Sequence, residues 1–336
     1  MSNLFKYYLK KRLPIICIIT GVMLAILCVS VLCNPYISYE YDHITGKQFV
    51  EVADNSPLGV IATFICILVS VIPVLEFKFK MTKISVDLYY QLPVKREKLF
   101  LTKYLVGLVE FIIPTLICYL VCLISIVTSN HLFEMQYFFM HIGAIILLGI
   151  VLYTTFVFLY TRANSIVDGI VNMCLWTFFF IAVFSALFRL TNTSIDLSFF
   201  FTYSPIASTN YVLEAMFLND KISRYEFDTL WFILVLFSIL GIISFILFII
   251  FSKKEKAEDS MQITNSYFSY NMLVPVMSST TLFCVEGESI IFLIVIAVLG
   301  YVLYVIQHKT FKVGIKKIII LLVCCIVSYI LGGLYY

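Results

Sequence analysis

Ionisable side chains inside long apolar runs are the residues of this sequence best placed to do chemistry. Glu110 stands in the apolar run 102–127. A helix places it roughly 12 Å from the start of that run, at about 1.5 Å per residue. Charge near mid-bilayer costs roughly 2.5–3.5 kcal/mol on insertion scales, so such a group usually has a role. We predict that Glu110 faces a polar path through the membrane, pairs across an interface between membrane subunits, or hydrogen-bonds to a neighbouring helix.

Other candidate residues predict structural roles. Asp168 begins the run 167–188, three residues after Ser165. This spacing fits a capping box, in which the serine caps the helix and the acid reaches back to a backbone N–H. His131 and His141 have no second His or Cys at helical ligand spacing, so we interpret them as interfacial residues. With no HExxH, GxSxG or clear aspartyl pair in the sequence, we expect no catalytic residue, metal or cofactor.

The stretch 85–105, SVDLYYQLPVKREKLFLTKYL, carries the most informative spacing. Asp87 to Leu92 predict a short amphipathic turn that Pro93 breaks, and a second helix from about Lys95 into the next apolar run. Such an element, tied to a membrane helix, could pass motion from a soluble partner if the two move together. The alternative is a basic loop with a proline turn that only sets orientation.

The elements that must position these residues are membrane helices. The chain is 62% hydrophobic and 13% charged, whereas soluble domains carry about a quarter charged residues. Its net charge of +3 does not indicate a nucleic-acid partner. Strong apolar runs lie at 13–33, 58–75, 102–127, 137–160, 167–188, 231–251, 289–306 and 318–334. We predict an all-α, polytopic transmembrane helical bundle, in contact with membrane lipid.

Lysine and arginine positions predict the orientation, since short basic loops stay cytoplasmic. The N-terminus is basic, through Lys6, Lys10, Lys11 and Arg12. We therefore place the N-terminus in the cytoplasm. The stretch 267–285 contains Pro275 and a polar run. We favour a crossing there, giving nine crossings and a cytoplasmic segment 308–317, with a re-entrant hairpin as the alternative.

The predicted organisation has two parts. Residues 1–251 form a six-span core, with an N-terminal interfacial helix at 4–12 and the short element near 85–98. Residues 252–336 form a cytoplasmic linker and two or three C-terminal spans. The charged run 253–258 in this linker is typical of a solvated flank after a membrane helix.

At Leu92, Pro93, Arg96 and Lys103 the sequence resembles the type-2 ABC exporter permeases, in which a coupling helix joins the second and third spans. Ser204 and Pro205 stand where that family often has a Ser-Pro. The charged run and added spans are similar to the bacterial acetoin-utilisation-type branch. The resemblance implies a transport subunit of the cell membrane, driven by a separate cytoplasmic ABC ATPase that hydrolyses ATP. It also implies a second permease chain, the same or different, and coupling to the ATPase through those four residues.

Two other classes of function remain open from the residues alone. An ion-coupled carrier would use discontinuous helices and buried ion ligands, for which the break at Pro275 is the one hint. A membrane-embedded enzyme acting on lipid or peptide would need convergent acids, histidines or a nucleophile, and the apolar runs offer Glu110. Neither the cargo nor the direction of transport is encoded in an apolar path.

Overall fold

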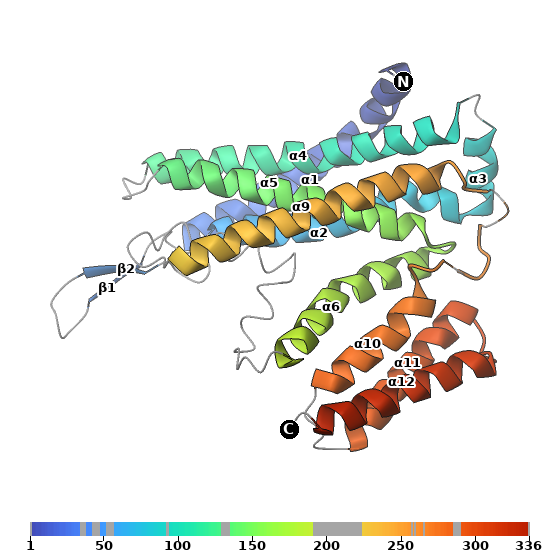
Figure 1. Ribbon diagram of the computed structural model, residues 1–336. Coiled ribbons are helices and arrows are strands. Elements are labelled where there is room, and N and C mark those ends of the chain that lie inside the picture. The colour runs from blue at the N-terminus through green and yellow to red at the C-terminus, as the bar shows by residue number, and fades with distance from the viewer. Residues whose placement is uncertain are drawn as a thin grey trace. The chain divides into compact units, whose positions relative to one another are not determined.

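The computed structural model describes residues 2–33, 38–41, 48–51, 57–91, 94–128, 135–190, 224–256, 258, 260–264, 266–284 and 290–334. Its longer helices are α1 (Ser2–Cys33), α2 (Pro57–Phe77), α4 (Arg96–Thr128), α5 (Met135–Thr161), α6 (Ile166–Leu190), α9 (Arg224–Ser252), α10 (Tyr270–Cys284), α11 (Ile290–His308) and α12 (Ile315–Leu334) (Figure 1). A 3-10 turn, η1 (Lys78–Met81), and a short helix, α3 (Lys83–Tyr90), separate α2 from α4.

The predicted fold class is confirmed. Within the described residues, seven helices are long and apolar enough to cross a membrane, so the chain is a multi-pass helical membrane protein. The strands β1 (Ser38–Tyr41) and β2 (Gln48–Glu51) add a small antiparallel hairpin between α1 and α2, with Tyr39 opposite Val50. Helices account for the rest of the described regular structure.

The chain divides into two compact units that do not follow a single boundary in sequence. Unit 1 comprises Met1–Glu76, Val94–Thr155 and Pro205–Lys253, and unit 2 comprises Phe77–Pro93, Phe156–Ser204 and Lys254–Tyr336. The predicted division at residues 251 and 252 assigned the fifth span to the core. Instead, α6 groups with the C-terminal helices because α10 packs against it.

Unit 1 is held by aromatic packing among α4, α5 and α9. The Tyr104 ring lies 5.4 Å from that of Tyr153 and 5.6 Å from that of Phe248, between centroids. Gly107 permits a close approach of these helices, because a Cβ there would lie 3.0 Å from a methyl group of Ile72 and collide with the Tyr153 hydroxyl. A larger residue at position 107 would therefore separate α4 from α2 and α5.

Unit 2 is built around α10. This helix packs against α6, α11 and α12, and Figure 1 shows α10, α11 and α12 side by side in orange and red. Its core combines Tyr270 and Val274 of α10 with Tyr304 of α11 and Leu321 of α12, all buried. The exposed apolar faces of α11 and α12 are as expected for helices that meet lipid.

Two predicted elements take a different form. The expected interfacial helix at 4–12 is continuous with the first span, because α1 runs from Ser2 through Pro14 to Cys33. Residues 4–13 are rich in Leu, Lys and Arg, which favour helix and supply no stop signal. The stretch 267–285 contains one helix, α10, of 15 residues with Pro275 inside it. At about 1.5 Å per residue it spans roughly 22 Å, less than a hydrocarbon core of about 30 Å.

The number of crossings can be tested at the loop between α11 and α12. Phe311 is 83% exposed there. Nine crossings place this loop in the cytoplasm, so a Phe311→Cys variant in inside-out vesicles should react with a membrane-impermeant maleimide. In right-side-out vesicles it should stay unlabelled until the membrane is permeabilised. Labelling only from the outside would show that α10 does not cross.

Candidate functional site: buried charges around the α3 segment

The structure describes two of the four residues of the predicted coupling pattern, Arg96 and Lys103, and these two differ in exposure. Leu92 and Pro93 lie outside the described residues. Arg96 is exposed at the first residue of α4, which begins one residue after the predicted start. Lys103, about two turns further on, is only 4% exposed. Lys103 therefore lies inside the bundle and not on the surface with Arg96.

The α3 segment, defined here as residues 77–91, forms a short amphipathic element between two membrane helices. Its helix begins after Thr82, where the backbone is extended, and ends at Tyr90, with Gln91 as the capping residue. Val86 is buried at 2% exposure, whereas Ile84 and Leu88 are 88% and 67% exposed. Residues four apart share one face of a helix. Ile84 and Leu88 thus form an exposed apolar ridge on one face of the helix, and Val86 lies on the opposite, buried face.

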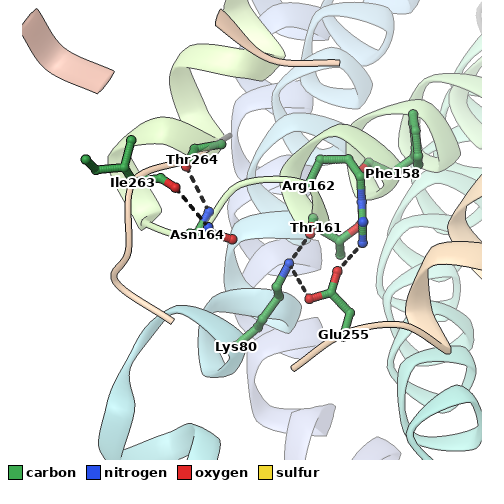
Figure 2. A network of polar contacts seen from close by, with 8 residues as sticks. All are labelled: Lys80, Phe158, Thr161, Arg162, Asn164, Glu255, Ile263 and Thr264. Carbon is green, nitrogen blue, oxygen red and sulfur yellow. Dashed lines mark hydrogen bonds and ion pairs between the residues drawn. The ribbon is translucent and has the colours of Figure 1, made fainter. Parts of the chain in front are cut away.

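Lys80 ties the α3 segment to two distant parts of the chain. Its ammonium lies 2.8 Å from Oε2 of Glu255 and donates a hydrogen bond to the carbonyl of Thr161, at the end of α5. Figure 2 shows Lys80 pointing into this cluster from the α3 segment. Lys80 is only 4% exposed, so its charge is balanced by these partners and not by water.

Arg162 completes the cluster from the turn after α5. Its guanidinium donates to Oε1 of Glu255, so this carboxylate receives one cation on each oxygen (Figure 2). Burial lowers the pKa of Arg162, and the Glu255 charge opposes that shift. Glu255 is 5% exposed. The prediction of a solvated flank at 253–258 is therefore wrong at Glu255, since the charge is buried with two partners.

Asp168 joins the start of α6 to the chain before α10. The Ser165 hydroxyl accepts a hydrogen bond from the Asp168 N–H at 3.2 Å, which confirms the capping half of the predicted box. The carboxylate does something else, because Thr264 and Tyr270 donate hydrogen bonds to it at 2.7 and 3.1 Å. Asp168 is 1% exposed. Its acid is thus a tertiary acceptor, and its predicted return to the helix start is corrected.

The same network reaches α11 and α12. The Gln307 side-chain amide donates to the Thr264 carbonyl at 2.6 Å, and Lys317 donates to Oε1 of Gln307 at 2.9 Å. The Lys317 ammonium also lies 5.5 Å from the centre of the Tyr304 ring. Residues 260–264 therefore connect the start of α6 with α11, and Gln307 connects them with α12.

A second charge cluster lies inside unit 1. Glu76 of α2 pairs with Arg12 of α1 and, at 3.0 Å, with the ammonium of Lys103. Lys103 also lies 4.0 Å above the centre of the Tyr8 ring. Glu76 is 1% exposed. This cluster fastens α1, α2 and α4 together through opposite charges.

Glu110 belongs to this second cluster. It is fully buried, and its Oε1 lies 3.4 Å from Nε of Arg12. Neither oxygen of Glu110 makes a hydrogen bond within the described part of the chain. The structure thus shows an ion pair from Glu110 to α1 inside the bundle, in place of the interhelical hydrogen bond that was one of the three predicted roles.

The structure does not describe the side chains of the remaining residues that the sequence singled out. His131, Ser204 and Pro205 lie outside the described residues, and His141 lies on α5 with its side chain outside the description. Where side chains are described, no group of three or more His, Cys, Asp or Glu is arranged to hold a metal ion.

Sequence reasoning missed Glu76, Lys80, Arg162 and Glu255 as partners. Each lies at or just beyond the end of an apolar run, where charge ordinarily marks a membrane boundary. The two acids are the feature of the sequence that could have predicted these pairs. Glu76 and Glu255 stand among basic residues, and membrane orientation explains the basic residues but not the acids.

Each of the two clusters holds its own helices together, and the carboxylates of Glu76, Glu110, Glu255 and Asp168 are paired with cations or hydrogen-bond donors. Comparison with known proteins adds no assignment to this geometry, since no family model, curated protein or solved structure matches the chain.

Proposed function

We propose that the chain is the membrane-spanning permease subunit of an ABC exporter, driven by a separate cytoplasmic ATPase. The observation that carries the proposal is the α3 segment, a short amphipathic helix that lies between the membrane helices α2 and α4 in the sequence. Its exposed ridge of Ile84 and Leu88 is the kind of surface that a soluble partner covers. The resemblance at Leu92, Pro93 and Arg96 lies immediately after this ridge.

In this proposal the ATPase binds the exposed ridge from the cytoplasm and hydrolyses ATP. Motion of the ATPase displaces the α3 segment, and two permease chains, identical or different, alternate between inward and outward access. The membrane chain supplies the path, and the partner supplies the energy. The basic N-terminus supports a cytoplasmic position for the α3 segment. If α1 starts in the cytoplasm and crosses outward, α2 crosses back, and the α3 segment follows α2 in the sequence.

An ion-coupled carrier is the second candidate, and Glu110 is the observation that favours it. A buried carboxylate that accepts no hydrogen bond from the described residues resembles the intramembrane acids through which transporters move protons or cations. Its pairing with Arg12 at 3.4 Å favours a structural role instead. We therefore rank the carrier below the permease.

The ridge is tested by purifying the tagged chain from its native membrane under mild detergent and identifying what accompanies it by mass spectrometry. An ABC ATPase should co-purify with the wild type. A variant carrying Ile84→Glu and Leu88→Glu should retain at least tenfold less of it, since about 1.4 kcal/mol of lost binding is tenfold in affinity.

The control is Tyr267→Glu, which places one such negative charge at a side chain that is 80% exposed elsewhere in unit 2. This variant should recover as much ATPase as the wild type. The absence of any ATPase from the wild-type preparation would contradict the proposed function, and would make Glu110 the next residue to test.

A further inference from the structure

We infer that Lys80, Glu255 and Arg162 form a rigid joint that ties the α3 segment to the linker between α9 and α10, and through this linker to the C-terminal helices. The inference rests on the proposed function, because it states where movement of the α3 segment is delivered. It assigns a role to the charged linker and to the helices that follow it.

The joint is assembled from three segments far apart in the sequence. Lys80 comes from the α3 segment, Arg162 from the turn after α5, and Glu255 from the linker (Figure 2). The Lys80 to Glu255 distance is 2.8 Å, and Lys80 also donates to the carbonyl of Thr161. One carboxylate therefore fixes two cations, and displacement of the α3 segment pulls directly on Glu255.

Burial distinguishes this joint from an ordinary surface pair. Lys80 and Glu255 are 4% and 5% exposed. By contrast, the Lys253 to Glu97 pair is 3.6 Å long, with side chains 55% and 41% exposed. Exposed pairs hold their partners weakly, whereas breaking a buried pair leaves an uncompensated charge. Separation of the α3 segment from the linker is therefore strongly disfavoured.

The linker passes the connection onward through residues 260–264. Met261 donates its backbone N–H to the Asn164 carbonyl at 2.9 Å, and the Asn164 N–H donates to Thr264 Oγ1 at 3.1 Å. Met261 has a φ of 63°, a left-handed conformation that a non-glycine residue keeps only when its surroundings hold it. The linker is thus fixed in place on both sides of this residue.

From Thr264 the connection enters the C-terminal helices. Its hydroxyl bonds to Asp168 at the start of α6, and its carbonyl accepts from Gln307 of α11. Because α10 packs against α6, α11 and α12, these helices are held to the same linker. Movement of the α3 segment therefore moves the C-terminal helices. Glu255 is the positioning residue between them.

The joint is tested by the position of the α3 segment when Glu255 is neutralised. Val86, on the anchored face of α3, is 2% exposed, so Val86→Cys should react slowly with a membrane-impermeant maleimide. Adding Glu255→Gln should accelerate labelling at position 86 at least tenfold, read by peptide mass spectrometry so that native cysteines do not interfere. In nanodiscs with the co-purified ATPase, the same change should lower ATP hydrolysis at least tenfold while the amount of bound ATPase is unchanged.

Lys253→Gln is the control, because Lys253 lies two residues from Glu255 but belongs to an exposed pair with Glu97, and this change should alter neither readout. If Glu255→Gln cannot be recovered folded, Lys80→Met is the second variant, because it leaves the pair between Glu255 and Arg162 in place. It should also accelerate labelling at position 86. Equal labelling rates with and without the Glu255 charge would overturn the joint, whatever the ATPase does. Failure of the wild type to bind an ATPase would instead overturn the proposed function, and the labelling rates would still decide the joint.

Discussion

Replacing Glu76 by Gln is expected to destabilise the protein by about 3–5 kcal/mol, the cost of removing one partner from a buried ion pair. Glu76 balances Arg12 and Lys103 together, with the Lys103 ammonium 3.0 Å from its carboxylate. Without that charge, the buried ammonium of Lys103 and the partly buried guanidinium of Arg12 are left with one remaining acid, Glu110. The loss should loosen the packing of α1 and α2 on α4.

The measurement is the unfolding free energy in mixed micelles, followed by helix content as the denaturing detergent is increased. Glu110→Gln should cost clearly less than Glu76→Gln, because Glu110 makes only a 3.4 Å contact with Arg12 and no hydrogen bond among the described residues. Lys253→Gln, in an exposed pair, should change stability by less than about 1 kcal/mol. A Glu76→Gln protein as stable as the wild type would contradict the role given to this cluster.

Replacing Asp168 by Ala is expected to cost about 3 kcal/mol and to release the linker before α10. The carboxylate accepts hydrogen bonds from Thr264 and Tyr270, and a hydrogen bond to a charged group contributes about 1.5–3 kcal/mol. The loss leaves two buried hydroxyl groups without their acceptor. Asp168→Asn retains one carbonyl oxygen as an acceptor and should cost less.

Local release can be measured by trypsin cleavage after Lys254 and Lys256, whose side chains are exposed on either side of Glu255. Cleavage in the Asp168→Ala variant should be at least tenfold faster than in the wild type, because proteolysis follows opening of the segment. The Thr264→Val variant should shift the rate in the same direction by a smaller factor. Unchanged cleavage after Asp168→Ala would show that the linker is held by other contacts.

The helices were predictable because membrane helices leave a strong signal in hydropathy. The run 102–127 predicted α4, and the basic residues before it predicted a helix start within one residue of Arg96. The interruption between α3, which ends at Tyr90, and α4, which begins at Arg96, was likewise predictable, since the sequence between them contains a proline, which removes a backbone donor and disfavours helix in the residue before it. Hydropathy and proline act on neighbouring residues, so the sequence of each segment is enough to predict its helix.

The partners of the charges were not predictable, because they depend on which helices meet. Lys103 fits a basic flank in sequence, yet its burial at 4% exposure depends on Glu76 from α2 and Tyr8 from α1. Glu255 fits a solvated run in the same way, and its burial depends on Lys80 and Arg162. Positive charge at a membrane boundary is ordinarily explained by membrane orientation. For this reason the basic residues alone give no sign that they form buried ion pairs.

The grouping of α6 with the C-terminal helices has a similar cause. Asp168 and Ser165 satisfy a local capping pattern, and the pattern does predict the hydrogen bond to the serine hydroxyl. The carboxylate nevertheless bonds to Thr264 and Tyr270, about a hundred residues away in sequence. A tertiary acceptor of this kind cannot be read from the spacing of its own helix.

The contact between the α3 ridge and an ATPase is tested most directly by a photo-crosslinking amino acid at position 88, where Leu88 is 67% exposed. Irradiation in native membranes should join this chain to an ABC ATPase. The same amino acid in place of Ile319, 54% exposed on the membrane helix α12, should not do so. Capture of the ATPase at position 88 alone is the result the permease account predicts. Crosslinking of position 88 only to lipid, or equally at both positions, would contradict it.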